Sequence, residues 1–173
     1  MTDSTSSLLA EMPAIGGVRV LDMGCGSGIL GLIAAVRGAS FVLCVDREKL
    51  AVRNARMNCQ ALIGEHKIAD GVVDVRRGRL FDFPGSPEFT QVGQKFDVVF
   101  ANLDIRPDEL RKGQIDQVAF IERVKEYVNP SGTVLLSYAS FGAALPNIRN
   151  AVNTSGIRWI ERSCNHLDIT WYV

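Results

Sequence analysis

The sequence of 173 residues lacks long apolar runs and an excess of charge of either sign. No apolar run approaches the roughly 18 residues that a membrane-spanning helix needs, so we expect no membrane contact. The polar residues 1–7 lack the basic and apolar regions of a secretory leader. The 19 basic residues balance the 19 acidic ones. This balance argues against strong nonspecific binding of nucleic acid, although a local basic patch would still permit it.

Side chains that bind metals are also scarce. The four cysteines show none of the paired spacings of metal sites: Cys25, Cys44, Cys59 and Cys164. We interpret them as buried free thiols in a reducing compartment, which favours the cytoplasm. The two histidines, His66 and His166, lie away from the ends of the predicted strands. We therefore expect structural or solvated roles for both histidines and no metal site.

Short apolar segments alternate with segments of helical periodicity along the chain. Continuous apolar runs predict strands over residues 18–23, 41–45 and 96–101, and further strands are predicted over 72–76, 133–138, 157–160 and 168–173. Helices are predicted over 27–37, 48–61, 114–128 and 141–154, and a loop with at most one helical turn over 84–94. Residues 1–7 are expected to be mobile, with one or two helical turns over 7–12.

This alternation predicts an α/β fold in which helices cover both faces of a parallel, doubly wound sheet. The continuous apolar strands fit burial on both faces. The chain shows no internal repeat and no long linker, so residues 1–173 are expected to form a single domain. Ligands of such sheets bind at the carboxyl ends of the strands, near the point where the strand order reverses.

The most informative stretch is residues 18–31, V-R-V-L-D-M-G-C-G-S-G-I-L-G. A strand ends in an acid, Asp22, and the glycines Gly24, Gly26 and Gly28 follow at alternate positions. Glycine allows a sharp turn and a close approach of the backbone to a ligand. The helix that follows offers unpaired N–H groups at its N-terminus. The stretch is therefore typical of a ligand-binding turn.

Two classes of ligand compete for this turn. The dinucleotide pattern is G-x-G-x-x-G, whereas this chain reads G-x-G-x-G and has Ile29 at the position of the last glycine. Asp46, at the end of the next strand, suits a ribose diol in either class. A carboxylate at Asp22 would repel a pyrophosphate but suits a cationic amino group. The turn therefore favours a nucleoside with a zwitterionic tail.

At these residues the chain resembles the class I S-adenosylmethionine-dependent methyltransferases. The resemblance lies in V-L-D-M-G-C-G-S-G-I-L, F-V-L-C-V-D, F-D-V-V-F-A-N-L-D and N-P-S-G-T-V-L-L-S, in that order. It implies a Rossmann-like, doubly wound sheet of seven strands, mostly parallel, with the last strand antiparallel. It also implies S-adenosylmethionine as the cofactor and places these residues around it: Asp22, Met23, Gly24, Cys25, Gly26, Gly28, Asp46, Arg47, Arg79, Leu80, Asn102 and Leu103.

The resemblance assigns roles to several of these residues. Gly24, Cys25, Gly26 and Gly28 would wrap the methionine part and the ribose. Asp22 would face the amino group of the cofactor. Asp46 would accept hydrogen bonds from both ribose hydroxyls, and Arg47 would stack near the adenine.

The third-strand motif departs from the pattern of the class, because Arg79 stands where an acid often contacts the adenine amino group. An arginine has no acceptor for that hydrogen bond. Either the Leu80 backbone and Asp82 hold the adenine, or the contact is lost. Arg79 as an ordinary surface residue is an equally good interpretation.

The fourth motif bears on the acceptor. Methyltransferases of amide or base nitrogens commonly have Asn-Pro-Pro followed by an aromatic residue, whereas this chain reads Asn102-Leu103-Asp104-Ile105. The aromatic ring that would stack on a flat acceptor is absent. Asn102 is a candidate catalytic residue, and Asp104 would orient an amine or take its proton, unless it is only an exposed loop acid.

This motif looks somewhat like that of ribosomal-protein lysine methyltransferases and release-factor glutamine methyltransferases. The resemblance implies transfer of a methyl group to a nucleophile, with an amine nitrogen on a protein or small molecule favoured. Two alternatives stay open. The chain would be a cofactor-binding subunit or catalytic fragment that needs a partner or a separate domain for substrate recognition, or it would be an RNA methyltransferase.

Overall fold

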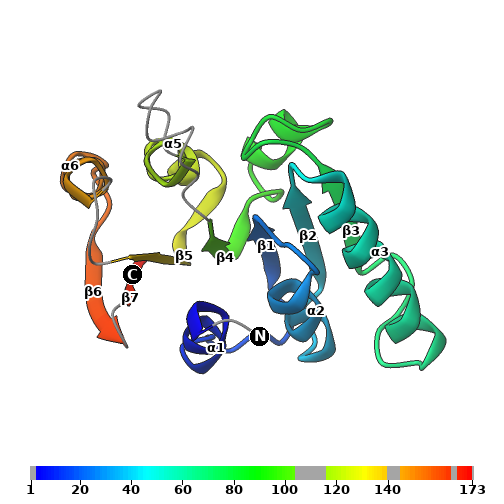
Figure 1. The fold of residues 1–173 in the computed structure, drawn as a ribbon. Coiled ribbons are helices and arrows are strands. Elements are labelled where there is room, and N and C mark those ends of the chain that lie inside the picture. The colour runs from blue at the N-terminus through cyan, green and yellow to red at the C-terminus, as the bar shows by residue number, and fades with distance from the viewer. Residues whose placement is uncertain (1–2, 104–115, 140–144, 165–166, 173) are drawn as a thin grey trace.

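A seven-stranded sheet forms the centre of the computed structural model, which describes residues 3–103, 116–139, 145–164 and 167–172 (Figure 1). The strands are β1 (Arg19–Met23), β2 (Phe41–Asp46), β3 (Val73–Arg77), β4 (Phe96–Asn102), β5 (Val128–Ala139), β6 (Trp159–Cys164) and β7 (Leu167–Tyr172). The helices are α1 (Asp3–Ala10), α2 (Ile29–Val36), α3 (Lys49–Gly64), α5 (Asp116–Arg123) and α6 (Leu145–Thr154), with short 3-10 helices η1 (Ser86–Thr90) and η2 (Val124–Glu126).

The order of the strands in the sheet is β3-β2-β1-β4-β5-β7-β6. The five strands from β3 to β5 are parallel, and β7 runs antiparallel to both β5 and β6. The chain winds outward from β1 to β3 and then returns to place β4 on the other side of β1. The strand order therefore reverses between β1 and β4, where ligands of such sheets bind. The predicted α/β, Rossmann-like fold is confirmed.

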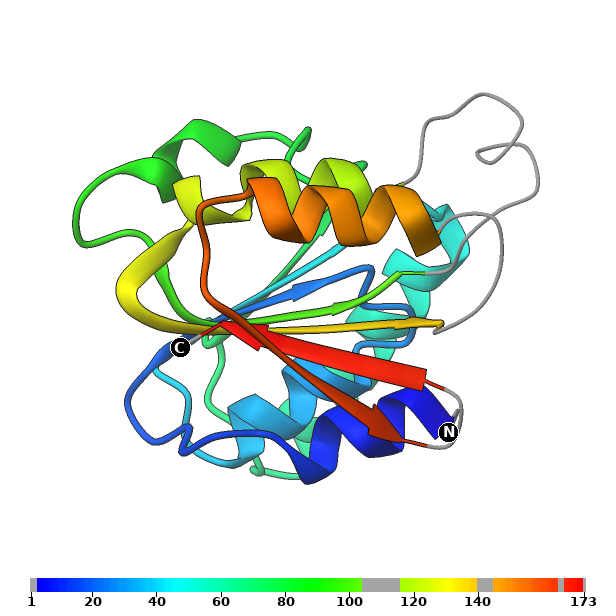
Figure 2. The same cartoon turned by 90° about the vertical axis from the view of Figure 1, so that its left-hand side faces the viewer.

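Helices cover both faces of the sheet, as Figure 2 shows edge-on. Neighbouring residues of one strand pack into different cores: Val20 and Val42 lie with α1, α2 and α3, whereas Leu21 and Leu43 lie with α5 and α6. All four side chains are fully buried. Strands that are buried on both faces need apolar residues at successive positions, which explains the continuous apolar runs in the sequence.

The N-terminal segment differs from the expectation. We expected mobile residues as far as Ser7 and a helical turn over residues 7–12, but α1 begins at Asp3 and ends at Ala10. Leu8 anchors this helix because its side chain is fully buried in the core that contains residues of α2, β4 and β5. Polar composition concealed the helix, since only one of its faces needs apolar side chains.

The segment before β5 also differs in detail. The helix predicted over residues 114–128 ends earlier, because α5 stops at Arg123 and η2 follows it. Strand β5 begins at Val128, before the predicted start at Thr133, and its pairing with β4 is irregular. Phe96 pairs with Val128 and Val98 with Thr133, so residues 129–132 form a bulge in the strand rather than only a turn before it.

The helices α2 and α6 agree with the sequence pattern where they are described. Gly28, with a φ of 84°, precedes α2, and Gly38, with a φ of 92°, follows it. Pro146 lies in the first turn of α6, where its missing N–H costs no helical hydrogen bond. Among the described helices, none is long and apolar enough to cross a membrane.

Candidate functional site

The turns after β1 and β4 meet at the point where the strand order reverses. Gly24 follows β1 directly and has a φ of 72°. A Cβ atom at this position would lie 2.6 Å from Cδ2 of Leu103, the residue after β4. Only glycine combines this backbone conformation with such a close approach. The glycine-rich turn is therefore packed against the residues of the fourth motif.

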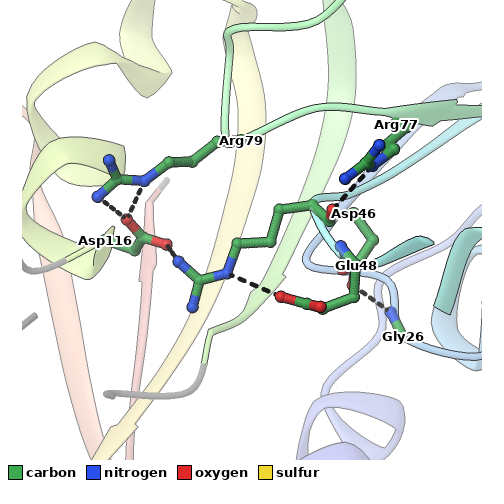
Figure 3. Close-up of polar contacts among 7 residues, drawn as sticks. Gly26, Asp46, Glu48, Arg77, Arg79 and Asp116 are labelled. Carbon is green, nitrogen blue, oxygen red and sulfur yellow. Dashed lines mark hydrogen bonds and ion pairs between the residues drawn. The ribbon is translucent and has the colours of Figure 1, made fainter. Parts of the chain in front are cut away.

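Asp46, at the end of β2, holds the glycine-rich turn from the other side. Its Oδ2 accepts a hydrogen bond of 2.9 Å from the amide of Gly26, and its Oδ1 accepts one of 2.8 Å from the amide of Glu48 (Figure 3). Gly26 has a φ of 56°, and a Cβ atom there would meet nothing within 4 Å. Glycine adopts this left-handed conformation without strain and leaves open space beside the carboxylate.

Two cavities meet around this turn and share Gly24, Gly26 and Asn102 in their walls. The first has a volume of about 170 Å³ and lies on the β2 side, with Asp46 and Leu80 in its wall. The second has a volume of about 330 Å³ and lies next to α1. The walls of the first cavity also include Met23, Arg47, Leu103 and Asp116, and those of the second include Thr5, Asp22 and Cys25.

Asp22 brings a buried carboxylate to the second cavity. Its side chain is 1% exposed, and Oδ2 accepts a hydrogen bond of 2.9 Å from the amide of Gly31 in the first turn of α2. The pKa of Asp22 is raised to about 7, mainly by burial; the hydrogen bond from Gly31 opposes this rise, and the nearby Asp46 carboxylate contributes to it. A cation in this cavity would therefore favour the ionised form of Asp22.

Gly31 is essential to this arrangement, although it lies outside the turn. A Cβ atom at Gly31 would lie 2.6 Å from Sγ of Cys44 and 3.2 Å from Oδ2 of Asp22. Helix α2 can approach β2 closely only because this position has no side chain. Cys44 and Cys25 are buried and free, as is Cys59 on α3, which agrees with the prediction of buried thiols. The side chain of Cys164 lies outside the described residues.

Asn102 ends β4 with its side-chain amide held on both sides. Its Nδ2 donates to Oγ1 of Thr5 in α1 at 3.2 Å, and its Oδ1 accepts a hydrogen bond of 2.7 Å from Oγ of Ser137 in β5. The Ser137 side chain is buried. A carbonyl oxygen accepts two hydrogen bonds, so Oδ1 keeps capacity for a second donor in the shared wall of the two cavities.

The third-strand turn places Leu80 and Arg79 differently. Leu80 adopts a φ of 50°, unusual for a residue other than glycine, and lies in the wall of the first cavity. Arg79 points to α5 instead, where its Nε and Nη2 donate to Oδ1 of Asp116 at 3.0 and 2.8 Å. Asp82 lies in neither cavity wall, and its side chain is 77% exposed and pairs with Arg123.

Asp116 also binds a second arginine, which lies in the turn after β2. Nη1 of Arg47 donates to Oδ2 of Asp116 at 2.7 Å, so one carboxylate joins the turns after β2 and β3 to the start of α5 (Figure 3). The Asp116 side chain is only 6% exposed. The next residue, Gln117, donates its side-chain amide to the carbonyl of Leu103. The first turn of α5 is thereby fixed against the rim of the first cavity.

The structure brings most of the predicted site residues together in the two cavity walls: Asp22, Met23, Gly24, Cys25, Gly26, Asp46, Arg47, Leu80, Asn102 and Leu103. Gly28 was expected to wrap the ligand, but it faces the protein interior. A Cβ atom there would lie 3.2 Å from Cβ of Ala55 in α3. Arg79 was placed around the cofactor by the resemblance, but it lies in neither cavity wall; its side chain is 47% exposed and is ion-paired with Asp116. Asp104 lies outside the described residues.

Sequence reasoning missed the contributions of Gly31 and Asp116 and the pairing of Ser137 with Asn102. Ser137 falls at the end of a predicted strand, which was the available signal, but nothing in the pattern pairs it with Asn102. Asp116 follows Arg79 by 37 residues, and no spacing rule connects them. Among the described residues, no group of three His, Cys, Asp or Glu side chains is arranged to hold a metal.

The donors and acceptors of the two cavities fit a nucleoside that carries an amino-acid tail. Asp46 offers carboxylate oxygens to a ribose diol, and each oxygen retains a lone pair after its backbone hydrogen bond. On the other side of Gly24 and Gly26, the Asp22 carboxylate suits a cationic amino group. Leu80 and Leu103 supply apolar walls for a base. A pyrophosphate would instead meet acidic groups at both ends.

Comparisons with known proteins agree with this site. Residues 4–138 match the family described as "Ribosomal protein L11 methyltransferase (PrmA)". The chain is 35% identical over 121 residues to a ribosomal protein L11 methyltransferase of Thermosipho melanesiensis, a match that covers 70% of this chain and 38% of the relative. It is 36% identical over 93 residues to a ribosomal RNA large subunit methyltransferase G of Stutzerimonas stutzeri, which covers 50% of this chain and 25% of the relative.

The fold is also similar to that of solved structures. A ribosomal protein L11 methylase of Lactobacillus delbrueckii subsp. bulgaricus superimposes with a TM-score of 0.69 at 20% sequence identity. The match covers 98% of this chain and 75% of that structure. At this level of identity the likeness concerns the fold alone. The chain spans well under half the length of the relatives from Thermosipho melanesiensis and Stutzerimonas stutzeri.

Proposed function

We propose that this chain, which belongs to the ribosomal protein L11 methyltransferase (PrmA) family of the class I S-adenosylmethionine-dependent methyltransferases, transfers the methyl group of S-adenosylmethionine to an amine nitrogen of a protein. The observation that carries the proposal is the pair of cavities that join at Gly24, Gly26 and Asn102. Asp46 faces one of them and Asp22 the other, which matches the two ends of such a ligand.

The cofactor, when bound, supplies an electrophilic methyl group, so the chain needs no covalent nucleophile. Its residues contribute binding and orientation. Asp46 would accept hydrogen bonds from the ribose hydroxyls, and Asp22 would hold the amino group. Asn102 lies where the two cavities meet, and the remaining acceptor capacity of its Oδ1 would orient an amine for in-line attack.

A protein acceptor is supported by the family description and by the relatives named for ribosomal protein L11. The acceptor motif of this chain has no aromatic ring beside Asn102 to stack on a flat base. An RNA acceptor is the second candidate, because the relative from Stutzerimonas stutzeri is named for ribosomal RNA. The balanced net charge of the chain makes RNA the weaker of the two.

We also propose that residues 1–173 act as one catalytic domain and that substrate recognition needs a partner or a further domain. The relatives are much longer than this chain, which supports the second part of the proposal. Buried free thiols at Cys25, Cys44 and Cys59 support a reducing compartment such as the cytoplasm.

Titration calorimetry with S-adenosylmethionine, S-adenosylhomocysteine and NADH tests the cofactor. We expect both sulfur nucleosides to bind and NADH not to bind, and the opposite result would end the proposal. Transfer of a labelled methyl group to ribosomal protein, ribosomal RNA and small-molecule fractions then tests the acceptor. Label in the RNA fraction alone would replace the protein acceptor with RNA.

A further inference from the structure

The first cavity has a carboxylate in its wall that the motifs of the sequence did not indicate. Asp116, at the first position of α5, lines this cavity together with Asp46, Leu80 and Leu103. Asp46 would accept the hydrogen bonds of the ribose hydroxyls. The base of the nucleoside would then lie between Leu80 and Leu103, because these residues supply the apolar part of the same wall.

The carboxylate of Asp116 retains an acceptor position after its ion pairs. Its Oδ1 accepts two hydrogen bonds from Arg79, and its Oδ2 accepts one from Arg47. A carboxylate offers about four acceptor positions, so these hydrogen bonds leave one on Oδ2. The group of the adenine ring that would use such an acceptor is the 6-amino group, which only donates.

We infer that Asp116 recognises the 6-amino group of the adenine and so replaces the acid that Arg79 displaced from the third-strand turn. This inference rests on the proposed function. The acid comes from the start of α5 rather than from the turn after β3, and Arg79, at the position of the usual acid, binds it. Selectivity for adenine over other purines is therefore a property of α5 in this chain.

The ion pairs with Arg47 and Arg79 offset the energetic cost of burying the Asp116 carboxylate. The Asp116 side chain is 6% exposed, and a buried carboxylate without partners is strongly unfavourable. Arg47 and Arg79 compensate its charge and orient its oxygens from two different turns. Gln117 adds a bond to the carbonyl of Leu103, which fixes the start of α5 relative to the cavity wall. Arg79 is accordingly a positioning residue.

Asp82 offers the natural comparison, because it is the acid closest in sequence to the usual position. Its side chain is 77% exposed and pairs with Arg123, and it does not line the first cavity. The aspartates at 82 and 116 each pair with arginine, but only Asp116 reaches the space where a base would lie. Asp82→Asn is therefore a matched control for Asp116→Asn.

The test combines a change in the protein with a change in the ligand. Calorimetry would measure binding of S-adenosylhomocysteine and of its analogue whose purine lacks the 6-amino group. We expect the wild-type chain to bind S-adenosylhomocysteine about tenfold or more tightly than the analogue, the factor typical of a hydrogen bond to a charged group. Asp116→Asn should weaken binding of S-adenosylhomocysteine more than binding of the analogue and so remove most of this selectivity.

Each other outcome has a distinct meaning. Equal binding of the two ligands by the wild-type chain would overturn the inference, as would an equal loss of both ligands in Asp116→Asn. Loss of selectivity in Asp82→Asn would transfer the role to Asp82. Failure of the wild-type chain to bind either ligand would instead refute the proposed function. If Asp116→Asn does not fold, Asp116→Glu keeps the charge but moves the carboxylate, and it should still reduce the selectivity for the amino group.

Discussion

The carboxylate of Asp46 binds the amide of Gly26 at 2.9 Å, although the two residues are 20 positions apart in the chain. This hydrogen bond joins the end of β2 to the turn after β1. It holds the glycine-rich turn open beside an acid that still has acceptor capacity. One side chain thus shapes the turn and contributes to the wall of the cavity that the turn encloses.

Replacement of Asp46 by alanine should weaken binding of S-adenosylhomocysteine by about 1.5–3 kcal/mol, because charge-assisted hydrogen bonds to the ribose are lost. Titration calorimetry measures the change. Asp70→Ala is the control, since Asp70 is exposed and its carboxylate binds the amide of Gly71, away from the cavities. An unchanged affinity in Asp46→Ala would remove this residue from the ribose site.

Asn102→Ala should abolish methyl transfer but leave the affinity for S-adenosylhomocysteine within about threefold of wild type, since the proposed role of this amide is to orient the acceptor. Single-turnover transfer and calorimetry measure the two quantities. Normal turnover in this variant would show that the fourth motif has been interpreted wrongly.

Ser137→Ala tests the orientation of the same amide. Ser137 donates to Oδ1 of Asn102 at 2.7 Å, so its loss frees the amide to rotate. We expect kcat to fall about tenfold, as for a misplaced catalytic group, while the cofactor affinity stays unchanged. Ser155→Ala is the control, because the Ser155 hydroxyl is also buried but binds the carbonyl of Val152. Equal kcat values for Ser137→Ala and wild type would show that Thr5 alone holds the amide.

The raised pKa of Asp22 predicts a dependence of stability on pH. Its pKa of about 7 in the folded chain exceeds the ordinary value of 3.8, so the folded state binds more protons than the unfolded state between these values. The contribution of Asp22 to the free energy of unfolding is therefore fully present below about pH 3.8 and is lost as the pH rises through about 7. Urea unfolding at several pH values should show a shallower decline over this window in Asp22→Asn.

The same group predicts release of a proton when the cofactor binds. The cationic amino group would favour the ionised Asp22, so binding below pH 7 should become weaker as the pH falls. Calorimetry at pH 6 in two buffers of different ionisation enthalpy would detect the proton. Identical heats in the two buffers would exclude a change in the protonation of Asp22, and Asp22→Asn should give identical heats.

Gly31→Ala should destabilise the chain by about 1–3 kcal/mol, the usual cost of overpacking a core. The new Cβ atom would lie 2.6 Å from Sγ of Cys44 and 3.1 Å from Cγ1 of Val42. Gly64→Ala is the control at the last residue of α3, where a Cβ atom would meet nothing within 4 Å. That variant should be neutral or slightly more stable, because alanine favours helix. Equal effects of the two substitutions on urea unfolding would contradict the close approach of α2 to β2.

The sequence by itself determined the fold class and the local chemistry around the glycine-rich turn. Apolar runs at successive positions required strands buried on both faces. The glycines at 24 and 26 and the acids at 22 and 46 are each tied to a strand end, so local pattern was sufficient to place them on one edge of the sheet. The third-strand turn showed only a departure from the pattern of the class. Arg79 excluded the usual contact between an acid and the adenine amino group, but nothing in the sequence indicated which residue would replace that acid.

The tertiary structure alone decided how the remaining side chains meet. Asp116 binds Arg79 and Arg47 across 37 and 69 positions, and Ser137 binds Asn102 across 35. Gly28 packs against Ala55 of α3, and Gly31 allows α2 to lie close to Cys44 of β2. Such contacts depend on how far each helix is shifted along the sheet and on which way its side chains point. Periodicity specifies the buried face of a helix, but it does not specify which residue of another element that face will meet.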